Sequence, residues 1–202
     1  MTARVMHFFP TPVIVDEVPG AAEINRQLEE AILAQQQSEP GLLLSNRGGW
    51  QSKRNFRSWA GEAGTRIIDH ATELANSSTG HRPDRLPPQW NVDVWTNVSR
   101  SGAFNMSHIH GGSYWSAVYY VRAGEGEGGQ LVLHDPRMPG LRMHAPGLRF
   151  KDAGPDVRAE INPKSGLMVL FPAWLSHSVE PWQGEGNRIS VAMNIRSAPV
   201  RA

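Results

Sequence analysis

The chain has 202 residues, contains no cysteine and carries a formal net charge of +1, so it is long enough for one domain with its own core. The lack of cysteine excludes disulfides, thiolate metal ligands and catalytic thiols, and the absence of any block of like charges argues against binding to nucleic acid or to a membrane surface. We expect a cytoplasmic protein, because the N-terminus lacks the layout of a signal peptide and no apolar run approaches the roughly 20 residues of a membrane helix.

The N-terminal part of the chain is expected to be extended and then helical. Residues 4–15 are β-rich around Pro10 and Pro12, which indicates an edge segment. Apolar residues at four-residue spacing predict a helix over 21–34, and a similar pattern predicts a second helix over about 61–76.

Two segments are long for plain connections. The connector 38–58 contains a glycine pair followed by Trp50 and Gln51, and residues 136–156 are rich in proline, glycine and arginine. Loops of this length are usually functional, so we expect both segments to border the mouth of a pocket and to gate or select a substrate.

From Trp90 onward the pattern changes from helical to strand-like. Turn signals such as Gly111-Gly112 separate short segments of β-forming residues. The expected strands lie near 90–98, 103–110, 114–122, 129–134, 157–162, 166–171, 176–182 and 187–196. About eight short strands with flanking helices predict a mainly β fold of the jelly-roll type.

Three histidines form the most informative pattern in the chain. His108 and His110 are two residues apart in an expected strand, so their side chains should project from the same face. His177 precedes another expected strand and could close the same face of a metal ion. Imidazole suits iron, zinc, copper or nickel, and open positions on such a site favour chemistry over structure. The pattern therefore indicates an oxygen-using metalloenzyme.

The last expected strand has one apolar and one small or polar face. Its apolar residues are Ile189, Val191, Met193 and Ile195, and the opposite residues are Arg188, Ser190, Ala192 and Asn194. We expect the apolar face to pack against the helices and the other face to line a pocket. A charged side chain inside a barrel needs a partner, and a ligand carboxylate that an arginine grips with two hydrogen bonds is a natural one.

Motifs spread over nearly the whole chain carry a family resemblance. They are Gly48-Gly-Trp-Gln-Ser52, Trp95-Thr-Asn-Val98, His108-Ile-His110, Ser116-Ala-Val-Tyr-Tyr-Val121, Gly129-Gln-Leu131, Asp135-Pro-Arg137, Phe171-Pro-Ala-Trp-Leu-Ser-His-Ser-Val179 and Arg188-Ile-Ser190. In this order and spacing they resemble the Fe(II)- and 2-oxoglutarate-dependent oxygenases, more narrowly a bacterial and phage group with His-x-His in place of His-x-Asp.

This resemblance implies a double-stranded β-helix, a cupin-like jelly roll. The chain would form one oxygenase-like domain over 1–202, with an N-terminal region 1–88 packed on a jelly-roll core 89–198. Fe(II) would be the metal, 2-oxoglutarate and O₂ the cosubstrates, and hydroxylation at a C–H bond the outcome.

The resemblance also implies roles for single residues. His108, His110 and His177 would hold the metal. Arg188, eleven residues after His177, would bind the far carboxylate of 2-oxoglutarate, with Ser190 in support. The family's usual ligand set has a carboxylate where this chain has His110. Either the site has three histidines, or a nearby carboxylate such as Asp93 or Asp135 substitutes.

Further candidates for the pocket lining are Asn97, Tyr119, Tyr120, Asn194, Trp50 and Gln51. Tyr119 and Tyr120 should point to opposite faces of one strand, so at most one of them can line the pocket.

Two rival functions remain open from the sequence. One is a cupin-type dioxygenase with three histidines that needs no 2-oxo acid, and an internal carboxylate partner for Arg188 would favour it. The other is a jelly-roll binding module without catalysis. The primary substrate, a small molecule or a peptide, and the formation of a homodimer are not determined by the sequence.

Overall fold

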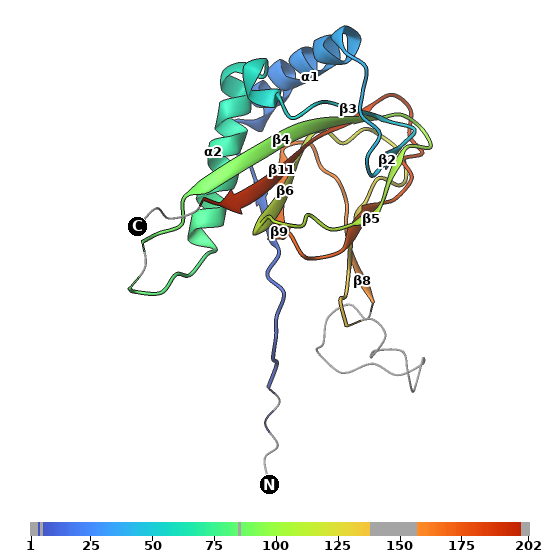
Figure 1. Cartoon of the computed structure of the whole chain (residues 1–202). Helices are drawn as coiled ribbons and strands as arrows, with labels where there is room; N and C mark the ends of the chain where they lie inside the picture. Colours follow the sequence, from blue (N-terminus) through green and yellow to red (C-terminus); the bar gives the residue numbers. More distant parts are fainter. Residues whose placement is uncertain (1–3, 5, 85, 138–156, 199–202) are drawn as a thin grey trace.

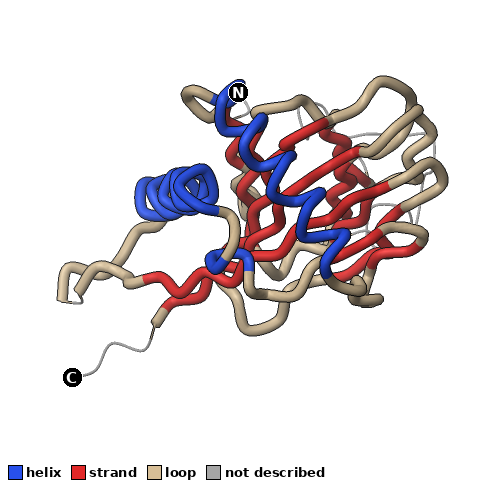
Figure 2. Tube along the Cα trace, turned by 90° about the horizontal axis from the view of Figure 1, so that it is seen from above, coloured by secondary structure: helices blue, strands red, loops and turns tan. Residues whose placement is uncertain are grey.

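Two antiparallel β-sheets face each other, and two helices cover the outer face of the larger sheet (Figures 1 and 2). The computed structural model describes residues 4, 6–84, 86–137 and 157–198. The larger sheet, sheet A, runs in the order β1 (Ile14–Glu17), β9 (Leu167–Pro172), β6 (Trp115–Arg122), β11 (Arg188–Ser197), β4 (Trp90–Ser99) and β3 (Trp50–Gln51). Sheet B runs in the order β2 (Asn46–Arg47), β5 (Phe104–His108), β10 (His177–Val179), β7 (Leu131–His134) and β8 (Arg158–Ile161). This arrangement confirms the predicted jelly roll.

The central strand β11 confirms the predicted alternation. It pairs with β4 along its whole length and with β6 on its other side. Its apolar side chains, such as Ile189 and Met193, are buried in the cluster that the helices cover. Arg188, Ser190 and Asn194 are also buried, but on the face toward sheet B, so polar groups enter the space between the sheets.

The helices are amphipathic, as their spacing predicts. Helix α1 (Ala21–Ser38) buries Ile24, Leu28 and Ile32, and helix α2 (Gly61–Ser77) buries its own apolar stripe against β6 and β9. Helix α1 ends four residues later than expected. Its end is explained by Pro40, because a residue before proline avoids the helical region, and Glu39 is extended at φ −141° and ψ 146°.

Strands from the N-terminal region join both sheets, which the sequence patterns did not indicate beyond the edge segment. The edge strand β1 covers 14–17, later than most of the expected segment 4–15. The connector 38–58 contains β2, β3 and the short 3₁₀ helix η1 (Phe56–Ser58). A strand of two residues is too short to show an alternating pattern in the sequence. Strands β2 and β3 are defined instead by their pairing with β5 and β4. Most of the expected loop 136–156 lies outside the described residues.

The space between the sheets is apolar on one side and polar on the other. The apolar side is formed by Tyr120, Leu131, Leu133, Leu167, Val169, Phe171 and Leu175. The polar side lies along β4 and β11, where Asn97, Arg188, Ser190 and Asn194 are buried. Among the residues that the structure describes, no helix combines the length and apolar composition needed to cross a membrane.

Candidate metal centre and polar pocket

The three predicted histidines come together between the two sheets. Strand β10 pairs with β5 so that His177 lies directly opposite His108, and cross-strand neighbours of this kind have adjacent side chains. The ring of His110 has its centroid 4.9 Å from that of His108 and 5.0 Å from that of His177. One potential ligand atom from each of the three residues lies within 4.8 Å of the others. This spacing allows all three imidazoles to reach one metal ion.

His110 reaches this position by a different route from the one expected. Strand β5 ends at His108, and His110 lies in the following turn. Its backbone N–H donates to the carbonyl of Ala173 at 2.9 Å, and its own carbonyl accepts from Ser113 at 3.3 Å. The turn, rather than strand parity, therefore directs His110 toward the other two rings.

Backbone carbonyls orient two of the imidazoles. The Nδ1 atom of His108 lies 2.7 Å from the carbonyl oxygen of Met106, and the Nδ1 atom of His177 lies 2.9 Å from that of Leu175. A carbonyl can only accept, so each Nδ1 carries the proton and each Nε2 keeps its lone pair. Histidines that bind metals commonly have such a second hydrogen bond. These partners could not be predicted from the sequence, because any residue supplies a carbonyl.

Burial keeps the three imidazoles neutral. It is the main cause that lowers the pKa of His177 to about 3 and the pKa of His110 to about 4, and it also lowers the pKa of His108. The neighbouring histidines add to the lowered pKa of His177, and His108 and Arg54 add to that of His110. Neutral imidazole is the form that binds metals, so these ligands need not lose protons first at neutral pH.

The metal-free protein should lose stability as the pH falls. Because the pKa of His177 and of His110 is lower in the folded state than the ordinary value of 6.5, the unfolded state binds more protons between about pH 6.5 and about pH 3. We expect the urea midpoint to fall between about pH 7 and about pH 5, and to fall less in His177→Asn. If the urea midpoint fell equally with pH in the unsubstituted protein and in His177→Asn, the result would contradict a lowered pKa of His177.

The two carboxylates considered as substitute ligands have other partners. Asp93 accepts from Arg54 at 3.3 Å and from Arg196 at 2.8 Å. Asp135 accepts from Arg137, which donates at 2.9 Å. In the described part of the chain, neither belongs to a group of three or more residues spaced to hold a metal ion, and only the three histidines form such a group.

Arg188 is buried between the two sheets without a counter-charge among the described residues. Its exposed fraction is 2 %, and no ion pair to it occurs among the described residues. Its guanidinium lies over the ring of Tyr120, 5.2 Å from the centroid, and its Nε has no hydrogen-bond partner in the part of the chain that the structure describes. Burial lowers the pKa of Arg188. An unpaired charge in such a place is costly unless an anion joins it.

Other buried polar atoms on the inner face of sheet A also lack hydrogen-bond partners among the described residues. They include the hydroxyls of Tyr120 and Ser116 and the amide oxygens of Asn97 and Asn194. Buried polar groups are usually hydrogen-bonded, so the unpaired hydroxyl of Tyr120, over whose ring Arg188 lies, suits a polar ligand at this end of β11. Gln51 is buried at the side of Asn97, with which it pairs.

Gly129 makes room for the side chain of Arg188, a contact that the sequence alone did not predict. A Cβ atom at Gly129 would lie 2.9 Å from Cδ and 3.0 Å from Nε of Arg188, and 3.4 Å from the ring of Trp182. The motif Gly129-Gln-Leu131 marked this glycine, but a single sequence does not indicate which side chain packs against it.

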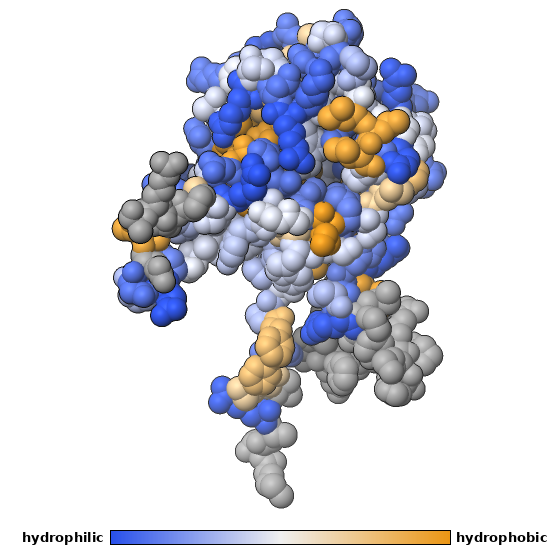
Figure 3. Space-filling view, viewed as in Figure 1, coloured by the Kyte–Doolittle hydropathy of each residue, from blue (hydrophilic) through white to orange (hydrophobic). Residues whose placement is uncertain are grey.

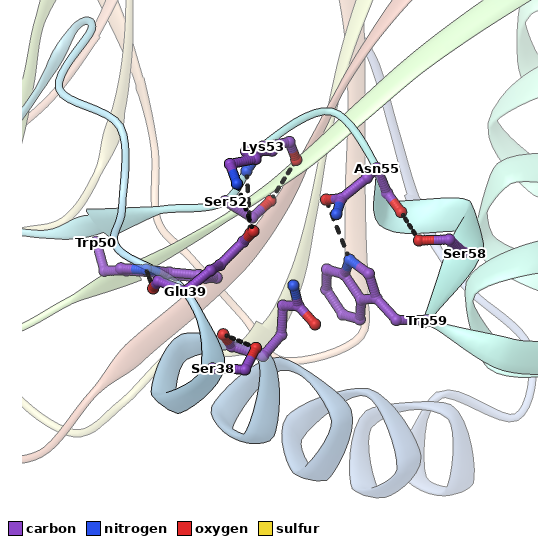
Figure 4. Close-up of polar contacts among 9 residues, drawn as sticks. Ser38, Glu39, Trp50, Ser52, Lys53, Asn55, Ser58 and Trp59 are labelled. Atoms are coloured by element: carbon purple, nitrogen blue, oxygen red, sulfur yellow. Dashed lines mark hydrogen bonds and ion pairs between the residues drawn. The ribbon is translucent and has the colours of Figure 1, made fainter.

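Two expected pocket residues face the helices instead. Tyr119 is fully buried in the helix-covered core, and its hydroxyl donates to Asn25 of α1 at 2.6 Å. Trp50 packs against the same core, and its Nε1 donates to the carbonyl of Glu39 at 3.2 Å (Figure 4). The pocket position expected for Trp50 was wrong, because its pairing in β3 sends its side chain to the outer face of sheet A, and of the two candidate tyrosines it is Tyr119 that alternation along β6 sends to the same face.

Trp50 lines a different hollow, at the edge of sheet A. This hollow of about 330 Å³ also includes Leu42, Leu43 and Arg100, and none of the three histidines. Leu43 and Leu44 next to it are exposed, and they belong to an apolar area over the connector between α1 and β2 (Figure 3). Trp50 therefore cannot act as a lid over the three histidines from this position.

The fold is thus a jelly roll whose three inward histidines could hold one metal ion and whose buried Arg188 has no ion-pair partner among the described residues. The family model described as "Putative 2OG-Fe(II) oxygenase" matches residues 93–194, just over half of the chain. The chain belongs to this family. It is thus an oxidoreductase of a class that uses Fe(II) and 2-oxoglutarate. No curated protein matches the sequence at a significant level.

Solved structures confirm the fold. A prolyl-4-hydroxylase from Pseudomonas putida is 16% identical with a TM-score of 0.62, and the match covers 93% of this chain and 94% of that chain. A prolyl hydroxylase from Trichoplax adhaerens, in complex with a hypoxia inducible factor peptide fragment, is 14% identical with a TM-score of 0.65, over 92% and 83% of the two chains. HygX from Streptomyces hygroscopicus, with nickel and 2-oxoglutarate bound, is 14% identical with a TM-score of 0.61, over 94% and 84%.

Proposed function

We propose that this protein is a hydroxylase whose Fe(II) is held by His108, His110 and His177 and whose 2-oxoglutarate is held by Arg188 and Ser190. The observation that carries the proposal is the buried Arg188, which lacks a carboxylate partner in the described chain and, like the three histidines, lies between the two sheets.

The histidines suit the metal. Their lowered pKa values leave neutral imidazoles, and the carbonyls of Met106 and Leu175 leave Nε2 of His108 and His177 free to bind. Three protein ligands leave coordination positions open for a chelating 2-oxo acid and for oxygen. When bound, Fe(II), 2-oxoglutarate and O₂ would together supply the oxidation of a C–H bond: one oxygen atom of O₂ would enter the substrate, and the other would enter the succinate formed as 2-oxoglutarate loses CO₂.

The chain's own groups suit the cosubstrate. The guanidinium of Arg188 can donate two hydrogen bonds to a carboxylate, and the hydroxyls of Tyr120 and Ser190 are the nearest candidates to complete its partners. Tyr120 takes this place alone, since Tyr119 faces the helices. The apolar side of the interior, with Phe171 against His177 at 4.7 Å between ring centroids, limits the access of water to the metal.

The donor set also supports a rival, a cupin-type dioxygenase that needs no 2-oxo acid. Three neutral ligands carry less negative charge than the family's usual set. An anaerobic titration of 2-oxoglutarate into the iron-loaded protein, followed by a succinate assay in air, separates the two. Our proposal expects iron-dependent binding and succinate release. An iron-loaded protein that neither binds nor converts 2-oxoglutarate would support the rival.

The primary substrate is a small molecule or a peptide side chain. The prolyl hydroxylase with its bound peptide fragment supports a peptide substrate, and a structure of HygX with hygromycin B bound supports a small molecule.

Replacing Gly129 with alanine should weaken 2-oxoglutarate binding without loss of iron. The new Cβ would collide with Arg188 and displace its guanidinium, so we expect a dissociation constant raised about tenfold, which corresponds to about 1.4 kcal/mol. Gly102→Ala is the matched control, because Gly102 has φ +82°, close to the +71° of Gly129, and no described atom lies within 4 Å of its added Cβ. Anaerobic calorimetry on both variants tests this. If both variants bind 2-oxoglutarate equally weakly, backbone strain at the substituted glycine, and not a collision with Arg188, causes the loss of affinity.

A further inference from the structure

A second cationic group lies at the metal centre, away from Arg188. Trp95 lies on the inner face of β4, nearly buried, and its ring centroid is 5.7 Å from that of His110. The guanidinium of Arg54 lies over the same ring, with its Cζ 5.6 Å from the centroid. Arg54 follows β3, so the connector that joins the two helices carries a positive charge to the side of the metal ligand.

This guanidinium remains open to solvent. The side chain of Arg54 is 56% exposed, whereas Arg188 is buried in the pocket. The stack on Trp95 holds the guanidinium in place and leaves donors free, because a planar guanidinium can stack and still donate hydrogen bonds at its edge.

The charges around Trp95 do not balance. Asp93 is shared by Arg54 at 3.3 Å and by Arg196 at 2.8 Å. Within the described part of the chain, no second carboxylate forms an ion pair with either arginine. Two cations therefore face one anion, and one positive charge is in excess. An ordinary surface ion pair has one cation for each anion and therefore no excess charge.

We propose that Arg54, stacked on Trp95 and backed by Arg196, binds a carboxylate of the primary substrate and so selects acidic substrates. This inference rests on the proposed function, since it needs the metal at His110. The carboxylate would accept two hydrogen bonds from Arg54 and place the rest of the molecule toward the three histidines. Arg188 cannot serve in this role if 2-oxoglutarate occupies it.

Binding can be tested without knowledge of the substrate. The probe is N-acetylglycine, added to protein that holds Zn(II) in place of Fe(II) and saturating 2-oxoglutarate, so that Arg188 is occupied. The readout is the indole N–H resonance of Trp95 in NMR spectra of labelled protein, assigned with Trp95→Phe. We expect a saturable shift with a dissociation constant on the order of 1 mM. N-acetylglycinamide, which lacks the charge, should cause none, and methyl phosphate tests whether any oxyanion suffices.

Two variants locate the effect. Arg54→Met should abolish the shift or weaken binding at least about tenfold, and Asp93 keeps Arg196 as its partner in this variant. Arg57→Met removes the same charge from the exposed neighbouring turn η1, outside the cluster on Trp95, and should leave binding unchanged.

The outcomes separate the two proposals. No saturable shift with N-acetylglycine, an equal shift with its amide, or an unaltered shift in Arg54→Met would overturn the carboxylate subsite. A stronger effect of methyl phosphate would reassign the subsite to phosphorylated substrates. If 2-oxoglutarate itself fails to bind the Zn(II) protein, the proposed function fails first, which the same titration reveals before the probe is added.

Discussion

Replacing His177 with alanine is expected to abolish stoichiometric iron binding. The imidazole of His177 is buried opposite His108, and its removal leaves two ligands in place of three. Loss of one of three protein ligands should weaken metal binding by orders of magnitude, because the remaining open positions would be filled only by water. Elemental analysis of protein purified and reconstituted with Fe(II) measures this, and His108→Ala should behave alike.

His134→Ala is a suitable control for this experiment. His134 ends the neighbouring strand β7, and its Nε2 lies 3.0 Å from the hydroxyl of Ser178, outside the group of three. It should keep a full equivalent of iron. His110→Asp should retain or strengthen Fe(II) binding, since it restores the carboxylate of the family's usual set. Unchanged iron in both His177→Ala and His108→Ala would rule out the metal assignment.

Replacing Arg188 with methionine is expected to weaken 2-oxoglutarate binding by at least about tenfold. Each charge-assisted hydrogen bond contributes roughly 1.5–3 kcal/mol, and methionine keeps much of the volume while it removes the charge. The measurement is an anaerobic titration of 2-oxoglutarate into the iron-loaded protein, followed by the metal-to-ligand absorption band. Iron content should stay unchanged, because Arg188 does not belong to the group of three histidines.

Arg122→Met is the control variant for this titration, because it removes the same charge at another position. Arg122 lies on β6 beside the start of β11 but points to the surface, where it pairs with Glu29 of α1 at 2.8 Å. Its removal should leave the dissociation constant of 2-oxoglutarate unaltered. A normal dissociation constant in Arg188→Met would instead favour the cupin-type rival.

Alternation and spacing predicted the parts of the site that belong to long strands. The ten residues of β11 show one apolar and one polar face, so the inward direction of Arg188, Ser190 and Asn194 followed from parity alone. Burial of Ile24, Leu28 and Ile32 in α1 followed equally from their four-residue spacing.

Features that depend on tertiary contact were not predictable in this way. The two residues of β3 have no periodicity of their own, so the side of the sheet that Trp50 faces depends on its pairing with Val98. Tyr119 and Tyr120 were known to face opposite ways, but the sequence did not indicate which of them the helices would cover. His110 lies in a turn whose direction is set by its bond to Ala173, a contact between distant segments.

The cluster around Trp95 illustrates the same limit. Arg54, Asp93 and Arg196 come from three separate segments, and only the pairing of β4 with β11 and the path of the connector bring them together. In the sequence, Asp93 was a candidate ligand for the metal. In the structure it binds two arginines, and the group that it helps to form adjoins His110, the proposed metal ligand.

The most direct test of the proposed function is a crystal structure grown anaerobically with Fe(II) and 2-oxoglutarate. We expect iron bound by one nitrogen from each of His108, His110 and His177, with the 2-oxo acid end of the cosubstrate on the metal and its far carboxylate on Arg188. Iron bound by Asp93 or Asp135, or 2-oxoglutarate bound away from Arg188, would contradict it.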